Sequence, residues 1–414
     1  MKNCIVIGGG IIGLCTAYYL QQEGHKVTVI DKSDITKGAS FVNAGYITPS
    51  HIIPLSAPGI ISKGIQWMFD ASSPFYVKPR LNRDFLEWSW AFKKSATAAK
   101  VKKAIPVIKE INLWSRELYQ NLKASQDFDF HFEHKGLFMY YQTEKAGAEE
   151  WEVGQRAISE GLQVRQLSKE EVKAFEPHMD LNIKGAIYYD SDAHMTPHEF
   201  MGNMCLFLKA KGVKFYTNEE VTDLVLQKYK LRTVVTPQRR LDADEVIFAA
   251  GSWTARLAKK LGLKITMQAG KGYRINVERP LDIKMPGILM EAKVAVTPMQ
   301  GLTRFAGTME IGGINHDIAM NRVRAIAKAA ASYYEGLKIN EAEIAGADCG
   351  LRPCSPDGLP YIGRSTTYDN VVIATGHAMM GWSLGPATGK LVAEIISDKT
   401  TTIDISPFHP ERRF

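Results

Sequence analysis

The sequence predicts an α/β fold in which a discontinuous parallel-sheet domain receives an inserted α+β domain built on an antiparallel sheet. Three observations predict this fold. A strand, glycine turn, helix and second strand follow one another within residues 4–30. Short buried-strand patterns ending in glycine recur at 245–251 and 370–376, and antiparallel patterns lie between these segments. One sheet therefore collects strands from both ends of the chain.

Composition supports an ordinary globular protein. The 414 residues are 45% hydrophobic and 23% charged, which excludes a disordered chain, a collagen-like repeat and a disulfide-stapled mini-protein. The length predicts two or three domains. The five cysteines are odd in number and scattered, so we expect a reducing, cytoplasmic compartment. His194 and His198 are four apart, but Thr196 and Pro197 between them mark a helix start rather than a two-histidine metal face, so no metal site is predicted.

The amino-terminal segment imitates a signal peptide, because Lys2 precedes a mostly apolar run from Cys4 to Leu20. Four glycines at the centre of this run disfavour one continuous helix. We interpret 4–7 as a buried strand, 8–13 as a turn, 11–23 as a helix and 27–30 as a second strand.

The glycine motif Gly8-x-Gly10-x-x-Gly13 lies between the first strand and the helix, the position that it has in dinucleotide-binding domains. Glycines at this spacing allow a tight turn, close approach of backbone to a pyrophosphate and close helix–strand packing. The phosphates lie at the helix N-terminus, where free N–H groups favour anions. Asp31, at the end of the second strand, is placed to accept ribose hydroxyls. The segment therefore predicts a Rossmann-like dinucleotide site.

The rest of the chain favours FAD over NAD. After Asp31 no further βα unit follows, and residues 32–58 are rich in Gly, Ser, Asn and Pro. The domain resumes at 245–251 and 370–376, before a helix at about 387–397. A nucleotide domain with another domain inserted suits FAD. We assign 1–85, 145–265 and 343–414 to the FAD-binding domain, and 86–144 and 266–342 to the substrate domain.

Strand patterns fill the inserted domain. Phenylalanines at 128, 130 and 132 alternate with polar residues, and residues 137–141 follow a short turn, which predicts a hairpin. Further strands are expected at 273–277, 293–298 and 303–310, the last two joined across Gln300 and Gly301. A helix is expected at 321–337. We interpret the strands as one sheet over the flavin.

Several motifs together resemble a known family. They are Gly8–Gly13 with Asp31, Ser40-Phe-Val-Asn43-Ala-Gly45-Tyr-Ile, Lys271-Gly-Tyr273, Gly350-Leu-Arg352-Pro-x-x-Pro356-Asp357-Gly358 and Gly376-His377-x-x-x-Gly381-Trp382. The chain resembles bacterial D-amino acid dehydrogenases, within the D-amino acid oxidase/glycine oxidase family of flavoproteins. The resemblance spans the chain. The first motif is shared by many flavoproteins, whereas the Ser-x-x-Asn-Ala-Gly loop and the last two motifs are far more specific.

The resemblance implies that FAD binds non-covalently and that 40–47 runs beside the flavin ring. The helix after residue 385 would direct its N-terminus at the flavin and stabilise negative charge there. The implied cofactor-binding residues are Gly8, Gly10, Ile11, Ile12, Gly13, Asp31, Lys32, Ser40, Asn43, Ala44, Gly45, Tyr46, Val221, Ala250, Gly251, Trp253, Arg352, Gly376, His377, Gly381, Trp382 and Ser383.

Three residues are the candidate catalytic set. In the family, the arginine matching Arg352 binds the substrate carboxylate, and guanidinium offers a planar fork for that purpose. The alternative is that Arg352 pairs with Asp357. Tyr273 would donate a phenolic hydrogen bond, with ordinary strand packing as its alternative. His51 would line the pocket or be a plain loop histidine.

The implied reaction is oxidative deamination of D-amino acids, D-proline and D-hydroxyproline among the candidates, by hydride transfer to flavin N5. The acceptor would be a quinone or an electron carrier. Two alternatives are a glycine/sarcosine-type amine oxidase that uses oxygen and a non-catalytic flavin-binding subunit. In oxygen-using relatives a lysine lies above the flavin, but 376–381 contains none.

The net charge of +7 does not indicate nucleic-acid binding, because no base-reading motif accompanies it. The densest basic stretch is either a solvated helix face or a contact with the inner membrane's cytoplasmic surface. Five of the seven tryptophans lie near it, and they either pack a helical layer or dock on lipid. The lysines and tryptophans concerned are Lys93, Lys94, Lys100, Lys102, Lys103, Trp67, Trp88, Trp90, Trp114 and Trp151.

Overall fold

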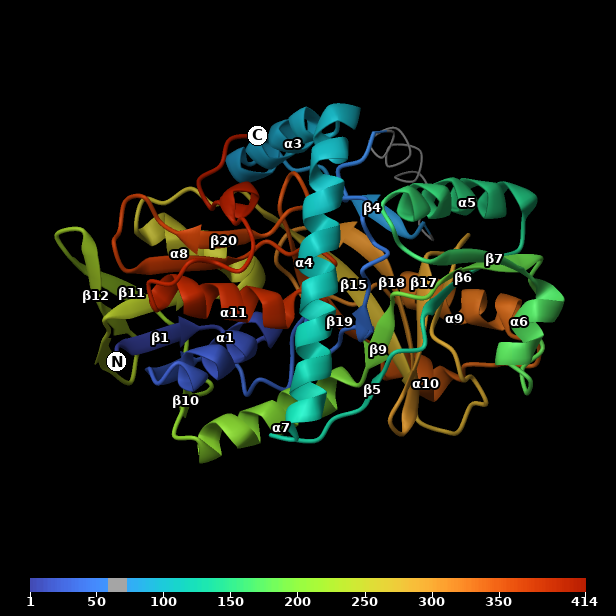
Figure 1. Ribbon diagram of the computed structural model, residues 1–414, viewed down its shortest axis with the longest axis horizontal. Coiled ribbons are helices and arrows are strands. Elements are labelled where there is room, and N and C mark those ends of the chain that lie inside the picture. Colours follow the sequence, from blue (N-terminus) through green and yellow to red (C-terminus); the bar gives the residue numbers. More distant parts are fainter. Residues whose placement is uncertain (59–72) are drawn as a thin grey trace.

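Two sheets dominate the computed structural model, which describes residues 1–58 and 73–414 (Figure 1). A six-stranded sheet and a nine-stranded sheet lie at opposite ends of the long axis, and one long helix, α4 (Ala98–Ser125), crosses the view between them. Both termini lie on the side of the six-stranded sheet. Trp67 lies outside the described residues.

The six-stranded sheet confirms the discontinuous domain. β1 pairs with β14 in parallel, Cys4 opposite Glu245, although 241 positions separate these residues. Only β20 runs antiparallel to its neighbour, β21. In spatial order the strands are β10 (Lys214–Tyr216), β2 (Lys26–Ile30), β1 (Asn3–Ile7), β14 (Glu245–Phe248), β21 (Val371–Thr375) and β20 (Tyr361–Arg364).

Alternating side chains of this sheet are buried on both of its faces, as a doubly covered sheet requires. One face packs against four helices, namely α1 (Ile11–Gln22), α4, α7 (Pro197–Ala210) and α11 (Gly385–Ile396). The other packs against α8 (Thr254–Lys260) and a small sheet of β11 (Asp223–Gln227), β12 (Lys230–Val235) and β13 (Arg240–Asp242). A Cβ at Gly389 would meet the Cys15 backbone at 2.5 Å, so glycine lets α11 lie directly on α1.

The larger sheet is mostly antiparallel. Its hairpin between β17 and β18 turns at Gln300 and Gly301, as predicted. Helices α9 (Met320–Tyr333) and α10 (Glu341–Ala345) pack on one face. The strands are β19 (Asp348–Cys354), β15 (Gln268–Val277), β18 (Leu302–Ile311), β17 (Val294–Met299), β16 (Gly287–Leu289), β6 (Leu137–Tyr141), β8 (Gly185–Tyr189), β7 (Val164–Ser168) and β4 (Phe75–Val77).

The hairpin predicted at 128–141 is wrong. β6 pairs with β8 and β16, whereas only β5 (Phe132–Glu133) of the alternating run is a strand. β5 belongs to a three-stranded sheet with β9 (Ala193–Met195) and β3 (Tyr46–Ile47). Phe128 and Phe130 instead pack edge-to-face on Phe200 of α7. An extended segment can bury every second side chain in this way without pairing with another strand.

Strand membership also differs from the domain boundaries that we assigned. β4, β7, β8 and β19 lie in the larger sheet, although we placed their residues in the FAD-binding domain. Conversely, α4 packs on α11, although we placed it in the substrate domain. The chain therefore passes between the two sheets more often than the assigned domain boundaries imply. The remaining elements are α3 (Arg83–Ser95), α5 (Glu144–Ser159), α6 (Lys169–Phe175) and the 3-10 turns η1 (Gly251–Trp253) and η2 (Ser406–Phe408).

Candidate functional site

A cavity of about 870 Å³ lies between the two sheets. The carboxyl ends of β1, β2, β14 and β21 form one side, and β19 of the larger sheet contributes Cys349, Leu351 and Arg352. Ligands of parallel α/β sheets bind at the carboxyl ends of the strands. The cavity therefore brings together segments near residues 10, 40, 250, 352 and 377, as the discontinuous domain predicts.

The glycine turn between β1 and α1 leaves room for a ligand. Gly8 has φ +112°, a conformation that glycine adopts without strain. A Cβ at Gly13 would overlap the Gly8 carbonyl oxygen, so Gly13 closes the turn rather than lining the cavity. The N-cap of α1, Gly10, makes no side-chain capping bond. The N-terminus of α1, at Ile11 and Ile12, lies at the cavity, and the N-terminus of a helix is suited to phosphate.

Asp31 is held rigidly at the end of β2. One carboxylate oxygen accepts from the Gly9 N–H at 2.6 Å, and the other accepts from the Ser33 N–H at 2.8 Å and the Ser33 hydroxyl at 2.7 Å. Beside it, the Lys32 ammonium lies 3.4 Å from the centre of the Trp253 ring. Both residues line the cavity, so a positive group and an aromatic face neighbour the carboxylate.

The loop at 40–47 is fixed from both sides. The Ser40 hydroxyl accepts from the Ile11 N–H at 3.0 Å and ties the loop to α1. On the other side, the buried guanidinium of Arg304 donates to the carbonyls of Phe41 and Asn43, and the Thr297 hydroxyl donates to the Ala44 carbonyl. Burial lowers the pKa of Arg304 to about 9. The larger sheet therefore positions this loop.

Two buried nitrogen atoms that line the cavity, in His377 and Trp382, are free to form a hydrogen bond with a ligand. His377 and Trp382 are each 1% exposed and line the cavity. The His377 Nε2 meets the Thr388 hydroxyl at 2.9 Å, but neither its Nδ1 nor the Trp382 Nε1 has a hydrogen-bond partner within the described part of the chain. Buried polar atoms are normally satisfied. Together with the glycine turn, these atoms fit a large polar cofactor.

Arg352, contributed by β19 of the larger sheet, brings to the cavity a guanidinium that suits a carboxylate. Its Nη1 donates to the Thr308 carbonyl at 3.0 Å, and a Cβ at Gly272 would overlap the guanidinium, which therefore lies flat across β15. No carboxylate of residues 1–58 and 73–414 forms an ion pair with it. Asp357, the alternative partner, is bound by both Nε and Nη2 of Arg412 at 2.7 and 2.8 Å.

The structure separates the other two catalytic candidates from Arg352. Side chains alternate along β15, so Tyr273 points away from the cavity and donates to Glu310 at 2.9 Å. Tyr273 does not line the cavity, and a hydrogen bond from its hydroxyl to substrate stays a prediction. His51 contacts the Ser50 hydroxyl at 3.1 Å, which in turn donates to buried Asp192 at 2.5 Å. Burial lowers the pKa of His51 to about 4, and the ring does not line the cavity.

Most of the expected cofactor-binding residues line the cavity, and six do not. The Tyr46 hydroxyl hydrogen-bonds to the Gly287 and Val296 carbonyls. The Ser383 hydroxyl donates to the Asn112 side chain and accepts from the Thr48 N–H. Those lining it are Gly8, Gly10, Ile11, Ile12, Asp31, Lys32, Ser40, Asn43, Val221, Ala250, Gly251, Trp253, Arg352, His377, Gly381 and Trp382, and those outside it are Gly13, Ala44, Gly45, Tyr46, Gly376 and Ser383.

Several cavity residues escaped the sequence analysis. Glu219 and Glu220 reach the cavity because β10 pairs with β2, so that the chain after β10 runs beside Asp31. His316 stacks on the outer side of Trp253 with ring centres 6.0 Å apart. Glu219 and Glu220 immediately precede Val221, which the sequence analysis did include, whereas no motif marks His316.

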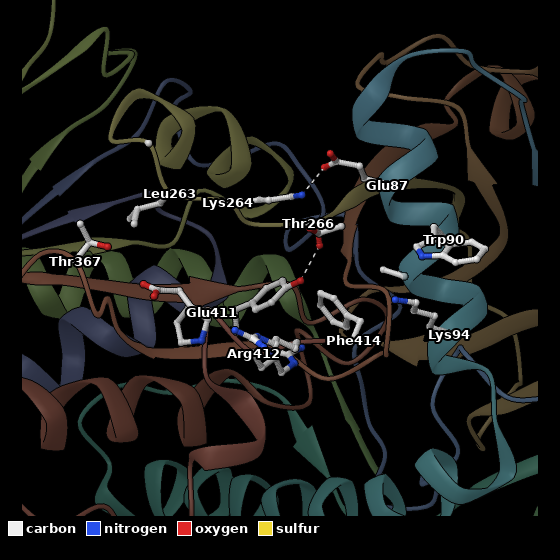
Figure 2. Close-up of a pocket in the computed structure, with 15 residues that line it drawn as sticks. Glu87, Trp90, Lys94, Leu263, Lys264, Thr266, Thr367, Glu411, Arg412 and Phe414 are labelled. Atoms are coloured by element: carbon white, nitrogen blue, oxygen red, sulfur yellow. Dashed lines mark hydrogen bonds and ion pairs between the residues drawn. The ribbon is translucent and has the colours of Figure 1, made fainter.

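A second hollow of about 600 Å³ contains none of the expected site residues. Figure 2 shows Trp90 and Lys94 of α3 on one side and the carboxy-terminal residues Arg412 and Phe414 on the other. Lys264 and Glu87 form an ion pair at 2.8 Å across its mouth. It lies away from the carboxyl ends of the parallel strands, where the Arg352 cavity is found.

Comparison with known proteins agrees with this geometry. The family described as FAD dependent oxidoreductase (DAO) matches residues 3–395. A D-amino acid dehydrogenase of Helicobacter pylori is 31% identical over 399 residues, 96% of this chain and 95% of the relative. A D-amino acid dehydrogenase of Neisseria meningitidis is 30% identical over 410 residues, covering 96% of each. The crystal structure of glycine oxidase from Geobacillus kaustophilus superposes with TM-score 0.78 at 22% identity, covering 100% and 99%.

The glycine turn, Asp31 and the buried unpartnered atoms of His377 and Trp382 all fit FAD, the cofactor of that family. The family match extends over nearly the whole chain, including both halves of the discontinuous domain. The chain belongs to the DAO family of FAD-dependent oxidoreductases.

Proposed function

We propose that this enzyme oxidises D-amino acids and that Arg352 binds their carboxylate. One observation carries the proposal: the guanidinium of Arg352, which pairs with no carboxylate among residues 1–58 and 73–414, lines the cavity that fits FAD. A guanidinium shielded from water gains most from a bidentate anionic partner. The names of the 30–31% identical relatives support a D-amino acid as that partner.

The chain's own residues act here by positioning. Arg352 holds the carboxylate, so that Cα presents one hydrogen toward the cavity. As Cα loses hydride, the nitrogen lone pair of the neutral amine forms a C=N bond. The resulting iminium ion gives one proton to water, and water then hydrolyses the imine to a keto acid and ammonia. Bound FAD supplies the hydride acceptor, N5. No side-chain base is required by this route, and neither His51 nor Tyr273 takes part in it.

Anaerobic bleaching of the yellow protein tests the proposal. We expect D-alanine, D-proline or D-hydroxyproline to abolish the visible flavin absorbance, whereas the L-enantiomers leave it unchanged. Bleaching by glycine and sarcosine alone would favour an amine oxidase. Absence of bleaching by every compound, while dithionite still bleaches the protein, would favour a non-catalytic FAD-binding subunit.

We infer that a quinone or an electron carrier, rather than oxygen, accepts the electrons and that FAD is held non-covalently. The segment 376–381 carries Met379 and Met380 and no lysine, and the relatives are named dehydrogenases. In the same cuvette, a soluble quinone should restore the yellow colour faster than air does. Acid precipitation should leave the flavin in the supernatant; yellow pellets would indicate a covalent bond.

We also propose that α3 and the start of α4 contact an anionic membrane surface. No helix in the described ranges is long and apolar enough to span a bilayer. Trp90 is 60% exposed, and Leu86, one turn earlier on α3, is 52% exposed. Lys93 and Lys94 flank the Trp90 ring, and three further exposed lysines follow, Lys100, Lys102 and Lys103. Exposed aromatics next to lysines suit an interfacial contact.

The other tryptophans of this region that the structure describes pack inward, as the helical-layer alternative holds. Trp88 donates to the Cys354 carbonyl, and Trp114 and Trp151 pack on apolar clusters. The contact we propose therefore rests on Trp90 and the lysines alone.

Charge reversal tests this contact. In sedimentation with phosphatidylglycerol vesicles, Lys93→Glu/Lys94→Glu should weaken binding at least about tenfold, because each lysine near an anionic surface contributes about 1 kcal/mol. Lys228→Glu/Lys230→Glu, at exposed positions of the β11–β12 hairpin, should bind as the parent does. Equal sedimentation of all three proteins, or none with any vesicle, would refute the contact.

A further inference from the structure

Three side chains that could ligate a metal converge outside the FAD cavity. Glu133 of β5 lies directly opposite His194 of β9 in the antiparallel register, and His131 precedes β5. About sixty positions separate the two histidines in the sequence, so no local motif marks the cluster. Tertiary structure alone brings the three residues together. None of them lines the cavity.

The ligand atoms have nearly the spacing of a metal site. The His194 Nε2 lies 3.3 Å from one Glu133 oxygen, and the His131 Nε2 lies 3.9 Å from the other. All three ligand atoms lie within 4.8 Å of one another. Zinc bonds of about 2.0–2.2 Å in tetrahedral geometry hold neighbouring ligand atoms roughly 3.4 Å apart. Small side-chain adjustments would therefore complete the site.

His194 supplies an independent observation. Its side chain is 0% exposed, and neither ring nitrogen forms a hydrogen bond with any group that the structure describes. Its Nε2 lies 3.3 Å from a Glu133 carboxylate oxygen, an arrangement that either a proton on Nε2 or a metal ion between the two groups would stabilise. A divalent ion satisfies both groups at once. Buried polar atoms without partners are rare enough to require such an explanation.

The surroundings of His131 support the same site. Its Nδ1 meets the Thr196 hydroxyl at 2.9 Å, which fixes the ring with Nε2 toward Glu133. Metal-bound histidines usually have such a partner on the other ring nitrogen. His131 is 18% and Glu133 is 32% exposed, so an ion can enter from solvent.

Lys135 competes with a cation for Glu133. Its ammonium lies 2.8 Å from the carboxylate oxygen nearest His194 and is 46% exposed. Exposed ion pairs contribute little to stability, so this lysine can be displaced. Its removal should therefore strengthen metal binding, whereas a plain Glu–Lys–His ion-pair cluster predicts no metal binding in either form.

We propose that His131, Glu133 and His194 form a site for a zinc-like divalent transition-metal ion, with water completing the coordination. The ion would fasten β5 to β9. Since β9 also pairs with β3, Tyr46 opposite His194, the site would brace the strand at the end of the 40–47 loop. This is a structural metal, and the proposal revises the sequence-based expectation that no metal binds.

Metal titration of the chelator-treated holoenzyme tests the proposal. Zn²⁺ should bind with a stoichiometry of one ion per chain and raise the melting temperature by a few degrees. Co²⁺ in the same site should give visible ligand-field bands on the long-wavelength side of the flavin absorption. These readouts do not depend on turnover.

Variants assign the binding to the cluster. His131→Ala and Glu133→Gln, both at partly exposed positions, should weaken Zn²⁺ binding more than tenfold, and Lys135→Met should strengthen it. His134→Ala is the matched control, because this neighbouring histidine instead contacts the Asp190 carbonyl. Absence of stoichiometric Zn²⁺ binding, or equal affinity in His131→Ala, Glu133→Gln and His134→Ala, would overturn the proposal and leave an ion-pair cluster.

Discussion

Replacing Arg352 with leucine is expected to leave FAD bound and to lower kcat/KM for D-amino acids roughly 10²- to 10⁴-fold. No carboxylate in the part of the chain that the structure describes pairs with the guanidinium, so two charge-assisted bonds to substrate would be lost. Each contributes about 1.5–3 kcal/mol, and about 1.4 kcal/mol corresponds to a factor of ten. FAD should remain, because the glycine turn and Asp31 lie on the other sheet. Steady-state kinetics and the flavin spectrum measure the two effects separately.

Two variants separate recognition from charge. Arg352→Lys keeps a cation but loses the planar fork, so we expect a smaller fall in kcat/KM than with leucine. Arg232→Leu removes an exposed arginine from β12 and should leave kinetics unchanged. If Arg352→Leu turned over D-amino acids at the normal rate, the substrate carboxylate would have to bind elsewhere.

The local parts of the nucleotide domain could be predicted from sequence because their signals are local. A strand, Gly8–Gly13, a helix and Asp31 follow one another within 31 residues, so one short stretch of sequence carries the whole signal. The sequence also predicted that the chain returns to this sheet at β14 and β21. Fully apolar strands ending in glycine are typical of the interior of a parallel sheet.

Pairing between distant segments could not be predicted in this way. Period-2 alternation shows that Phe128 and Phe130 share a face, but the same pattern arises in an extended segment packed on α7. For Tyr273, the motif identified the strand but not the face. Gly272 and Arg352 occupy the cavity side, so Tyr273 must point to Glu310. The cluster of His131, Glu133 and His194 depends entirely on the register of β5 with β9.

Gly13→Ala is expected to have the largest effect on stability. The new Cβ would overlap the Gly8 carbonyl oxygen, and neither backbone can move without displacing α1 from β1. We expect the free energy of unfolding to fall by roughly 3 kcal/mol, near the upper end for overpacking. The ratio of FAD to protein should fall with it. Gly10→Ala should behave differently, because its Cβ meets only the Ser40 hydroxyl, at 3.1 Å. It should weaken FAD binding while the apoprotein keeps its melting temperature.

Gly202→Ala provides the matched control for both substitutions. Gly202 is an exposed glycine within α7, and a Cβ there meets nothing within 4 Å. Alanine at such a helical position stabilises by about 0.5–1 kcal/mol, the opposite sign to Gly13→Ala. Melting temperatures of the apoproteins by circular dichroism and FAD content by absorbance measure both effects. Parent-like stability and FAD content in Gly13→Ala would show that the turn tolerates a side chain, and the glycine spacing would then not be what admits the pyrophosphate.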